Sequence, residues 1–332
     1  MDPTELSNEE MILSFLAEGG DDYISGAALS DKLGLSRTAV WKYVEQLRKM
    51  GYRIDAQSAK GYRLLEVPDR LSSLEVGPLL ATRDLGRTLH HYESLDSTNV
   101  KAFELAQEGG FHGEVIVTEH QTSGKGRRGR SWSSPAGKSL AMSVILRPEL
   151  PPSRAPEVTL VAAVALAETL RDSGVEGDIK WPNDVQIAGK KVAGILTELS
   201  ADVERVHFIV LGIGVNLNTE LQDFPAEIAE LATSVSLARN NRVHRALFTA
   251  ALLGKLEFWL DRWTEDGFEP VRKKWKELTS TLGQEVLVRA DQKELRGVAE
   301  DIDESGALML RVGDKLERVL SGDVERVLAR KS

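Results

Sequence analysis

Hydrophobic and polar residues recur with two different periods along the 332-residue chain, one typical of helices and one typical of strands. In the first 50 residues, apolar positions recur at the three- and four-residue spacing of amphipathic helices, as with Val40, Val44 and Leu47. Ser36 stands where it can cap that helix, and Gly34 can supply the turn from the preceding one. The pattern predicts three helices, the last two forming a helix-turn-helix over about residues 26–45.

Charge is segregated in the same segment. Residues 1–31 carry eight acidic residues and no Lys or Arg, whereas residues 32–65 carry eight Lys or Arg against two acidic residues. Short runs at 52–54 and 61–64 predict a two-stranded wing. We therefore expect residues 1–66 to form a winged helix-turn-helix domain that binds DNA. The expected DNA contacts are Arg37, Thr38, Lys42 and Lys60. The alternative is a small helical domain that contacts no DNA.

Strand-like and helix-like segments alternate in the rest of the chain. Pro68 marks a linker and connecting segment over residues 67–87. We expect a central domain over 88–277 and short antiparallel strands, compatible with a small β-barrel, over 278–332. In the central part the predicted strands are 115–117, 139–146, 191–199 and 207–217, and the predicted helices are 97–107 and 158–171. The fold class predicted is α+β, with one large mixed sheet in the centre.

Composition excludes several classes of function. The net charge of −9 and a pI near 5.4 argue against a protein that coats nucleic acid or anionic membranes. With no cysteine, disulfides, thiolate metal sites and a Cys nucleophile are excluded. The six histidines show no metal-ligand spacing, so no structural metal is expected. The acidic start has no signal-peptide core, and residues 158–170 are too short to span a bilayer, so we expect a cytoplasmic protein with no membrane partner.

The segment 124–130 combines four cations with three glycines in seven residues. Glycine leaves backbone N–H groups accessible, and Lys and Arg neutralise phosphate or carboxylate oxygens, so we interpret the segment as a loop that binds a small anion. A solvated surface cluster or a nonspecific nucleic-acid contact are the alternatives. A P-loop is excluded because Trp132 occupies its first glycine position, and Leu217 replaces the third glycine of a dinucleotide fingerprint.

Five motifs in order carry a family resemblance. They are Ser97-Thr98-Asn99, Gln121 with residues 124–132, Lys180-Trp181-Pro182-Asn183-Asp184, residues 191–196 and residues 212–217. Together they resemble the biotin protein ligases, and with the preceding DNA-binding domain the whole chain resembles the bifunctional bacterial biotin ligases that also repress the biotin operon. The resemblance implies a ligase-like catalytic domain and an SH3-like C-terminal barrel.

The resemblance also implies a two-step reaction. Biotin and MgATP give biotinyl-5′-adenylate, and the biotinyl group then passes to a lysine of the biotin carboxyl carrier protein of acetyl-CoA carboxylase. The adenylate would act as corepressor, so operator DNA and a second copy of the chain, in an adenylate-bound homodimer, are implied partners. Magnesium is expected only with ATP.

By resemblance, each predicted site residue receives a role. The biotin site comprises Ser97, Thr98, Asn99, Gln121, Lys125, Gly126, Arg127 and Lys191. The nucleotide and phosphate site comprises Arg128, Arg130, Lys180, Asn183 and Asn216. The catalytic residues are Lys191, Arg127 and Asp184, of which Asp184 is the candidate for orienting or deprotonating the acceptor amine. A helix cap at Ser97 and a proline-centred turn at 180–184 are the simpler structural alternatives.

The chain departs from the family pattern at three places. Lys125 stands where Arg is common, residue 131 is Ser where a basic residue is frequent, and residues 219–234 contain no Trp to stack on adenine. Two alternative functions stay open: a lipoate-type acyl ligase, and a catalytically inactive transcription factor that senses biotin.

Overall fold

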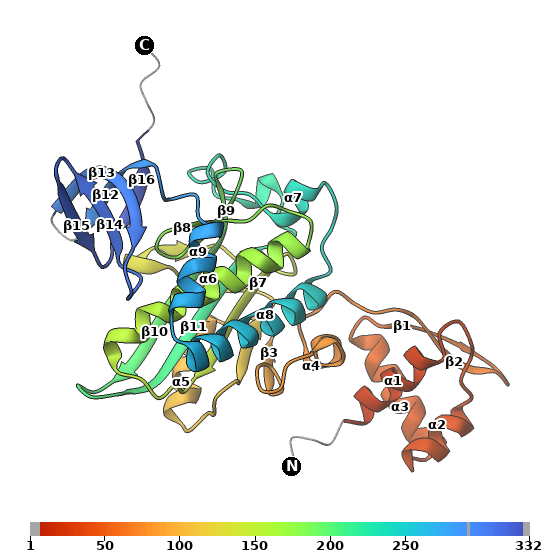
Figure 1. The fold of residues 1–332 in the computed structure, drawn as a ribbon. Coiled ribbons are helices and arrows are strands. Elements are labelled where there is room, and N and C mark those ends of the chain that lie inside the picture. The colour runs from red at the N-terminus through yellow and green to blue at the C-terminus, as the bar shows by residue number, and fades with distance from the viewer. Residues whose placement is uncertain (1–6, 291–292, 328–332) are drawn as a thin grey trace.

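The computed structural model describes residues 7–290 and 293–327, so the predicted domain ends at 1–6 and 328–332 lie outside the described residues. Three parts follow one another along the chain: a helical domain with a wing, a central sheet covered by helices, and a C-terminal sheet (Figure 1). The α-helices are α1 (Asn8–Glu18), α2 (Gly26–Leu33), α3 (Arg37–Lys49), α4 (Ser73–Val76), α5 (Thr98–Gln107), α6 (Ala155–Asp172), α7 (Val235–Arg239), α8 (Arg245–Asp266) and α9 (Glu269–Leu278).

The N-terminal domain has the predicted helices and wing. The Ser36 hydroxyl accepts a hydrogen bond from Ala39 N and begins α3, and Gly34 ends α2 in the left-handed conformation with φ +65°. Apolar residues of the three helices and the wing form their own core. The wing consists of β1 (Arg53–Gln57) and β2 (Gly61–Glu66), which pair antiparallel. At Gly61, with φ +113°, a Cβ would lie 2.0 Å from Ile24 O, so this crossing requires glycine.

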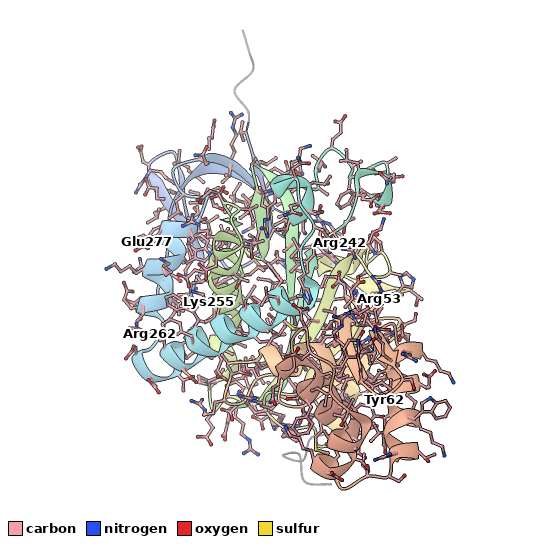
Figure 2. The ribbon with its side chains drawn as sticks, turned by 90° about the vertical axis from the view of Figure 1, so that its right-hand side faces the viewer. Arg53, Tyr62, Arg242, Lys255, Arg262 and Glu277 are labelled. Carbon is pink, nitrogen blue, oxygen red and sulfur yellow. The ribbon has the colours of Figure 1, made fainter. Side chains whose placement is uncertain are left out.

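A short helix connects the N-terminal domain to the rest of the protein. The buried Tyr52 hydroxyl, just after α3, donates to Glu75 Oε1 of α4 at 2.5 Å, and Leu74 packs against the N-terminal core. On its other side α4 contacts α8. The view in Figure 2 has this domain in front, with charged side chains of α8 and α9 such as Lys255 and Glu277 projecting outward beside it.

The central domain is built on a seven-stranded mixed sheet with the order β3-β4-β7-β11-β10-β9-β8. Its strands are β3 (Leu89–Tyr92), β4 (Val115–Thr118), β7 (Ser139–Leu146), β8 (Asp178–Lys180), β9 (Asp184–Ile187), β10 (Lys190–Ala201) and β11 (Val206–Asn216). Only β3 and β4 pair in parallel among these neighbours. The α+β prediction with one large mixed sheet is confirmed.

Successive side chains of a strand point to opposite faces of the sheet, and different helices cover the two faces. Val115 and Val117 of β4 join the large core beneath α6 and α8, whereas Ile116 packs in a second cluster beneath α5. Helix α6 begins and ends close to the predicted limits, and α6, α8 and α9 lie together on one side of the sheet (Figure 1). Hydrophobic clusters thus pack against both faces of the sheet.

The most apolar of the described helices, α6, is a core helix. Its Glu157 is buried and accepts hydrogen bonds from Trp263 Nε1 and from the Arg154 guanidinium. A buried carboxylate with such partners is satisfied inside a protein. Among the described residues no helix is both long and apolar enough to cross a membrane.

The C-terminal part is a five-stranded antiparallel sheet with the order β15-β14-β13-β12-β16. Its strands are β12 (Glu285–Ala290), β13 (Lys293–Ile302), β14 (Leu308–Val312), β15 (Lys315–Val319) and β16 (Asp323–Arg326). The predicted antiparallel strands are confirmed, while closure into an SH3-like barrel stays a prediction. Trp181 joins this part to the central domain, because its indole N–H donates to Gly306 O at 3.0 Å and its backbone N–H donates to the Thr281 hydroxyl.

Candidate active site

A cavity of about 630 Å³ lies where the five sequence motifs converge. Segments of β7, β10 and β11 line it, and three residues of β16, Asp323, Val324 and Glu325, reach it from the C-terminal sheet. The predicted site residues that line it are Ser97, Thr98, Asn99, Gln121, Lys125, Gly126, Arg127, Arg130, Lys180, Asn183, Asp184 and Lys191. Residues spread over almost 100 positions of the sequence therefore face one space.

At one end of the cavity, the uncharged side chains of Thr98, Asn99 and Gln121 belong to a buried polar network. Gln121 Oε1 accepts from Thr98 N at 2.9 Å and from the Thr98 hydroxyl at 3.2 Å. Ser143 Oγ lies 2.8 Å from Thr98 Oγ1 and 2.7 Å from Asn99 Oδ1. Asn99 in turn donates to Glu198 Oε2 at 2.7 Å. Such a network fixes donors and acceptors in place for a neutral polar group.

Ser97 occupies the N-cap position of α5, so the structural alternative for this motif holds, although its side chain makes no capping hydrogen bond among the described residues. A Cβ at Gly212 would lie 2.0 Å from Asn99 Oδ1. The glycine in β11 therefore makes room for a side chain of the polar network.

The basic loop crosses the other end of the cavity. It consists of β5 (Gly124–Lys125) and β6 (Ser131–Trp132), which pair, with a 3₁₀ turn at Arg127–Gly129 between them. Arg127 donates to Asn183 Oδ1 at 3.0 Å. Burial lowers the pKa of the Arg127 guanidinium below its ordinary value, but a guanidinium stays protonated at neutral pH. Arg127 therefore brings a partly desolvated positive charge to the cavity.

A second cation lies beside an acid and an indole ring. Lys191 Nζ is 2.7 Å from Asp184 Oδ1 and 5.7 Å from the centroid of the Trp132 ring. A Cβ at Gly214 would lie 2.5 Å from Trp132 Cε2, so this glycine lets the indole lie flat on β11. Trp132 Nε1 is buried and has no hydrogen-bond partner among the described residues. The site thus offers an open donor next to the Lys191 ammonium.

The C-terminal sheet contributes acids to the same cavity. Asp323 forms an ion pair with Arg130, and Arg128 Nη1 lies 3.6 Å from the same carboxylate and donates to Arg289 O at 3.2 Å. Glu325 also lines the cavity. The outer cations of the loop are thereby held by the C-terminal part, whereas Arg127 faces inward.

Two predicted nucleotide residues lie outside the cavity lining. Arg128 adopts φ +54° and points to the C-terminal sheet, and Asn216 is buried and donates to Thr233 O at 3.0 Å. Their roles stay predictions.

Three residues near the cavity were not predicted from the sequence. Ser143 received no role, although a polar residue inside an apolar strand was a signal for it. Asp323 and Glu325 were also missed, since no local signal exists for them.

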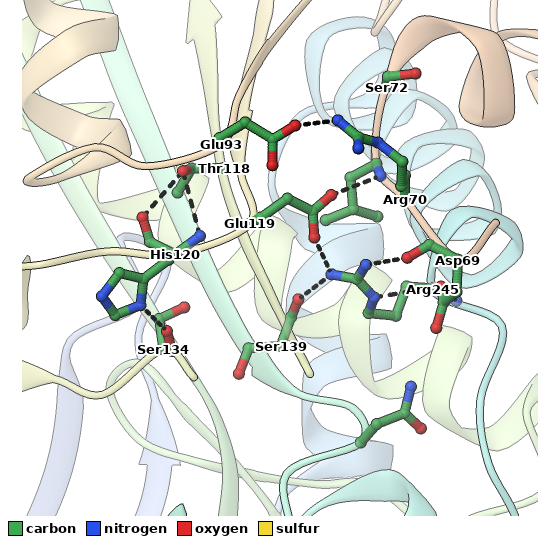
Figure 3. Close-up of polar contacts among 12 residues, drawn as sticks. Asp69, Arg70, Ser72, Glu93, Thr118, Glu119, His120, Ser134, Ser139 and Arg245 are labelled. Atoms are coloured by element: carbon green, nitrogen blue, oxygen red, sulfur yellow. Dashed lines mark hydrogen bonds and ion pairs between the residues drawn. The ribbon is translucent and has the colours of Figure 1, made fainter. Parts of the chain in front are cut away.

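A buried ionic network supports the polar end of the cavity (Figure 3). Arg245 is 1% exposed; its Nη1 lies 2.8 Å from Glu119 Oε2, and its Nε lies 3.2 Å from Asp69 Oδ1 of the linker. Burial by itself raises the pKa of Glu119, but the His91 and Arg245 side chains outweigh it and lower that pKa to about 2. Because Glu119 precedes Gln121 by two residues, the network holds the chain that carries Gln121.

The predicted DNA contacts lie apart from this cavity. Arg37, Thr38 and Lys42 are exposed on α3, and Lys60 is exposed at the turn between β1 and β2. A basic helix face and a wing tip are the two parts of a winged domain that reach duplex DNA.

Fold and cavity together define a class of protein: a mixed-sheet domain whose cavity carries both neutral polar and cationic side chains, preceded by a winged helix-turn-helix domain. Three family descriptions match in order, an HTH domain over residues 8–63, the Biotin/lipoate A/B protein ligase family over 92–216 and the biotin protein ligase C-terminal domain over 281–327.

Relatives extend the match over nearly the whole chain. The "Bifunctional ligase/repressor BirA" of Bacillus subtilis is 38% identical over 95% of this chain and 97% of its own length, and that of Escherichia coli is 29% identical over 94% and 95%. The chain therefore belongs to the biotin protein ligase family. Among solved structures, the biotin protein ligase of Aquifex aeolicus in complex with biotin and ATP superposes with a TM-score of 0.64 at 26% identity, covering 73% of this chain and 99% of that one.

Proposed function

We propose that this chain forms biotinyl-5′-adenylate from biotin and MgATP and transfers the biotinyl group to a lysine of a biotin carboxyl carrier protein. The observation that carries the proposal is the cavity itself, whose lining combines the uncharged side chains of Thr98, Asn99 and Gln121 with the cations of the basic loop and Lys191. Biotin has the same polarity, with a neutral ureido ring at one end and a carboxylate at the other. The names of the relatives agree with this substrate.

In the first step a biotin carboxylate oxygen attacks the α-phosphorus of ATP. A C–O–P anhydride forms, the bond from the α-phosphorus to the bridging oxygen breaks, and pyrophosphate leaves. Two anions must approach each other, so positive charge at the reacting oxygens lowers the barrier. Arg127 and Lys191 supply that charge, and Lys125, Arg130 and Lys180 add to it around the phosphates. Magnesium enters with ATP as part of the substrate.

In the second step the neutral amine of the acceptor lysine attacks the acyl carbon. An amide bond forms, the acyl–oxygen bond breaks, AMP leaves, and the amine loses a proton. Asp184 lies at the cavity and within 2.7 Å of Lys191, which makes it the candidate for orienting the amine and accepting that proton. Asn183, held by Arg127, fixes the neighbouring backbone turn.

The second proposed activity is repression of biotin synthesis genes. The adenylate would be the corepressor, and an adenylate-bound homodimer would place two winged domains on a two-fold operator. The supporting observation is the basic face of α3 and the wing, fixed to the ligase part through Tyr52 and Glu75. Full-length protein with biotin and ATP should bind the promoter of biotin synthesis genes with sequence preference; binding that ignores sequence would refute repression.

Mass spectrometry tests the ligase proposal directly. Purified protein is incubated with MgATP and either biotin or lipoate, and the acyl-adenylate and its transfer to a carrier domain are followed. We expect biotinyl-adenylate and a biotinylated carrier. Lipoyl-adenylate instead would indicate a lipoate-type ligase, and no adenylate from either acid would indicate an inactive sensor.

An Asp184→Asn variant separates the two steps. We expect adenylate to form while transfer to the carrier slows by about 10²-fold or more, the scale of general base catalysis. Unchanged transfer would remove Asp184 from the reaction.

A further inference from the structure

An exposed tryptophan lies on the helix that we assign to DNA. Trp41 of α3 is 53% exposed, whereas Val40, Val44 and Leu47, which form the adjacent face of the same helix, are completely buried. The helix is thus packed through its aliphatic face, and the indole contributes nothing to the described core of the domain. Single exposed apolar side chains are common on protein surfaces, so the position of Trp41 on the basic helix face, and not its exposure alone, makes it a candidate contact.

The residues around Trp41 define the chemistry of that molecule. Arg37 and Thr38 lie one turn before it on the helix and Lys42 follows it, and all three are exposed. One turn after it, Glu45 is paired with Arg48 at 2.6 Å, so the acid on this face is neutralised. The surroundings of the indole are therefore cationic, which fits a polyanion with apolar groups at its surface.

The wing is held in a fixed position beside this helix. The Arg63 guanidinium lies 4.8 Å from the centroid of the Tyr23 ring, and Lys60 Nζ lies 5.5 Å from it. The Tyr23 hydroxyl also donates to Asp55 of β1. Arg48 of α3 donates to Ile54 O of β1 at 2.7 Å, so the helix and the wing are also joined by a hydrogen bond.

We propose that Trp41 reads sequence by packing against the C5-methyl group of a thymine in the major groove, while Arg37, Lys42 and Lys60 contact flanking phosphates. Thymine methyls are the apolar feature of major-groove base edges, and apolar side chains recognise them. The inference deepens the proposed repressor activity and rests on it. A second copy of the chain is the competing occupant of this surface.

The experiment uses full-length protein saturated with biotin and MgATP. A duplex is first selected from a random pool by the wild-type protein. Each thymine of that duplex is then replaced in turn by uracil, which lacks only the methyl group, and binding is measured by fluorescence anisotropy. We expect the wild type to lose at least about fivefold in affinity at one position of each half-site.

Trp41→Ala should bind the unmodified duplex at least about fivefold more weakly and should not respond to uracil at that position. Trp41→Phe should keep part of the response. Lys42→Ala is the contrast, because loss of a phosphate contact should lower the salt slope by about one and leave the uracil profile unchanged. Phe111→Ala, which truncates a similarly exposed aromatic far along the chain, is the matched control and should change nothing.

Three outcomes would overturn the proposal. Trp41→Ala could keep the wild-type affinity and uracil profile, or it could weaken self-association instead, which would assign the surface to a second copy. A wild-type protein without sequence preference would refute repression itself, and this result is seen before any variant is tested. Adenylate synthesis and thermal unfolding, measured for each variant, should equal those of the wild type.

Discussion

Replacing Arg245 by Met removes the central cation of the buried network while keeping an unbranched apolar side chain. Glu119 and Asp69 then remain with no guanidinium between them. Breaking a buried ion pair by deleting one partner costs about 3–5 kcal/mol. The pKa of Glu119 points in the same direction, because, although burial raises it, the His91 hydrogen bond and the Arg245 guanidinium together lower it from 4.5 to about 2 and Arg245 accounts for part of that shift.

Thermal unfolding followed by circular dichroism measures this loss. For a domain of this size about 3–5 kcal/mol lowers Tm by roughly 6–20 °C. Arg242→Ala is the matched control, because Arg242 also pairs with Asp69 but its side chain is 69% exposed, so it should change the free energy of unfolding by less than about 1 kcal/mol. The KM for biotin should also rise in the Arg245→Met variant, since the network holds the segment after β4 that carries Gln121.

The pH dependence of this difference has a definite sign. Since the folded-state pKa of Glu119 is lowered, its contribution is present above the unfolded pKa and disappears as pH falls through the folded pKa. The gap between wild type and Arg245→Met should therefore close between about pH 4.5 and 2. A gap that persists unchanged at low pH, or equal small shifts for both arginine variants at pH 7, would refute the electrostatic reasoning.

Three further predictions concern the cavity. Arg127→Ala should speed adenylate dissociation by at least about tenfold, as expected for losing a charged hydrogen bond, whereas Arg48→Ala in the N-terminal domain should not; filter retention of labelled adenylate compares them. Asp323→Asn removes an acid that pairs with the basic loop, so the KM for ATP should fall, and a rise would show that the pair orders the loop for ATP. Gly214→Ala places a methyl group against Trp132 and should reduce adenylate synthesis more than it lowers Tm, with initial rates and melting curves as the two readouts.

Much of the architecture followed from local patterns. Ser36 and Gly34 marked α3 and the preceding turn because capping depends on residues within one turn. The apolar run 139–146 became β7 without change of limits. Helix α8 was not predicted, because its exposed face also carries apolar residues, among them Leu247 and Phe258, and these obscure the amphipathic period of its buried residues.

The sequence by itself also predicted twelve of the residues that line the cavity, since five short motifs in order are enough to indicate the family. Tertiary structure alone decided their partners. Asp323 meets Arg130 from 193 positions away, and Ser143 joins Thr98 across 45 positions. Such contacts arise from the packing of one domain or strand on another, and no periodicity or motif in the chain encodes them locally.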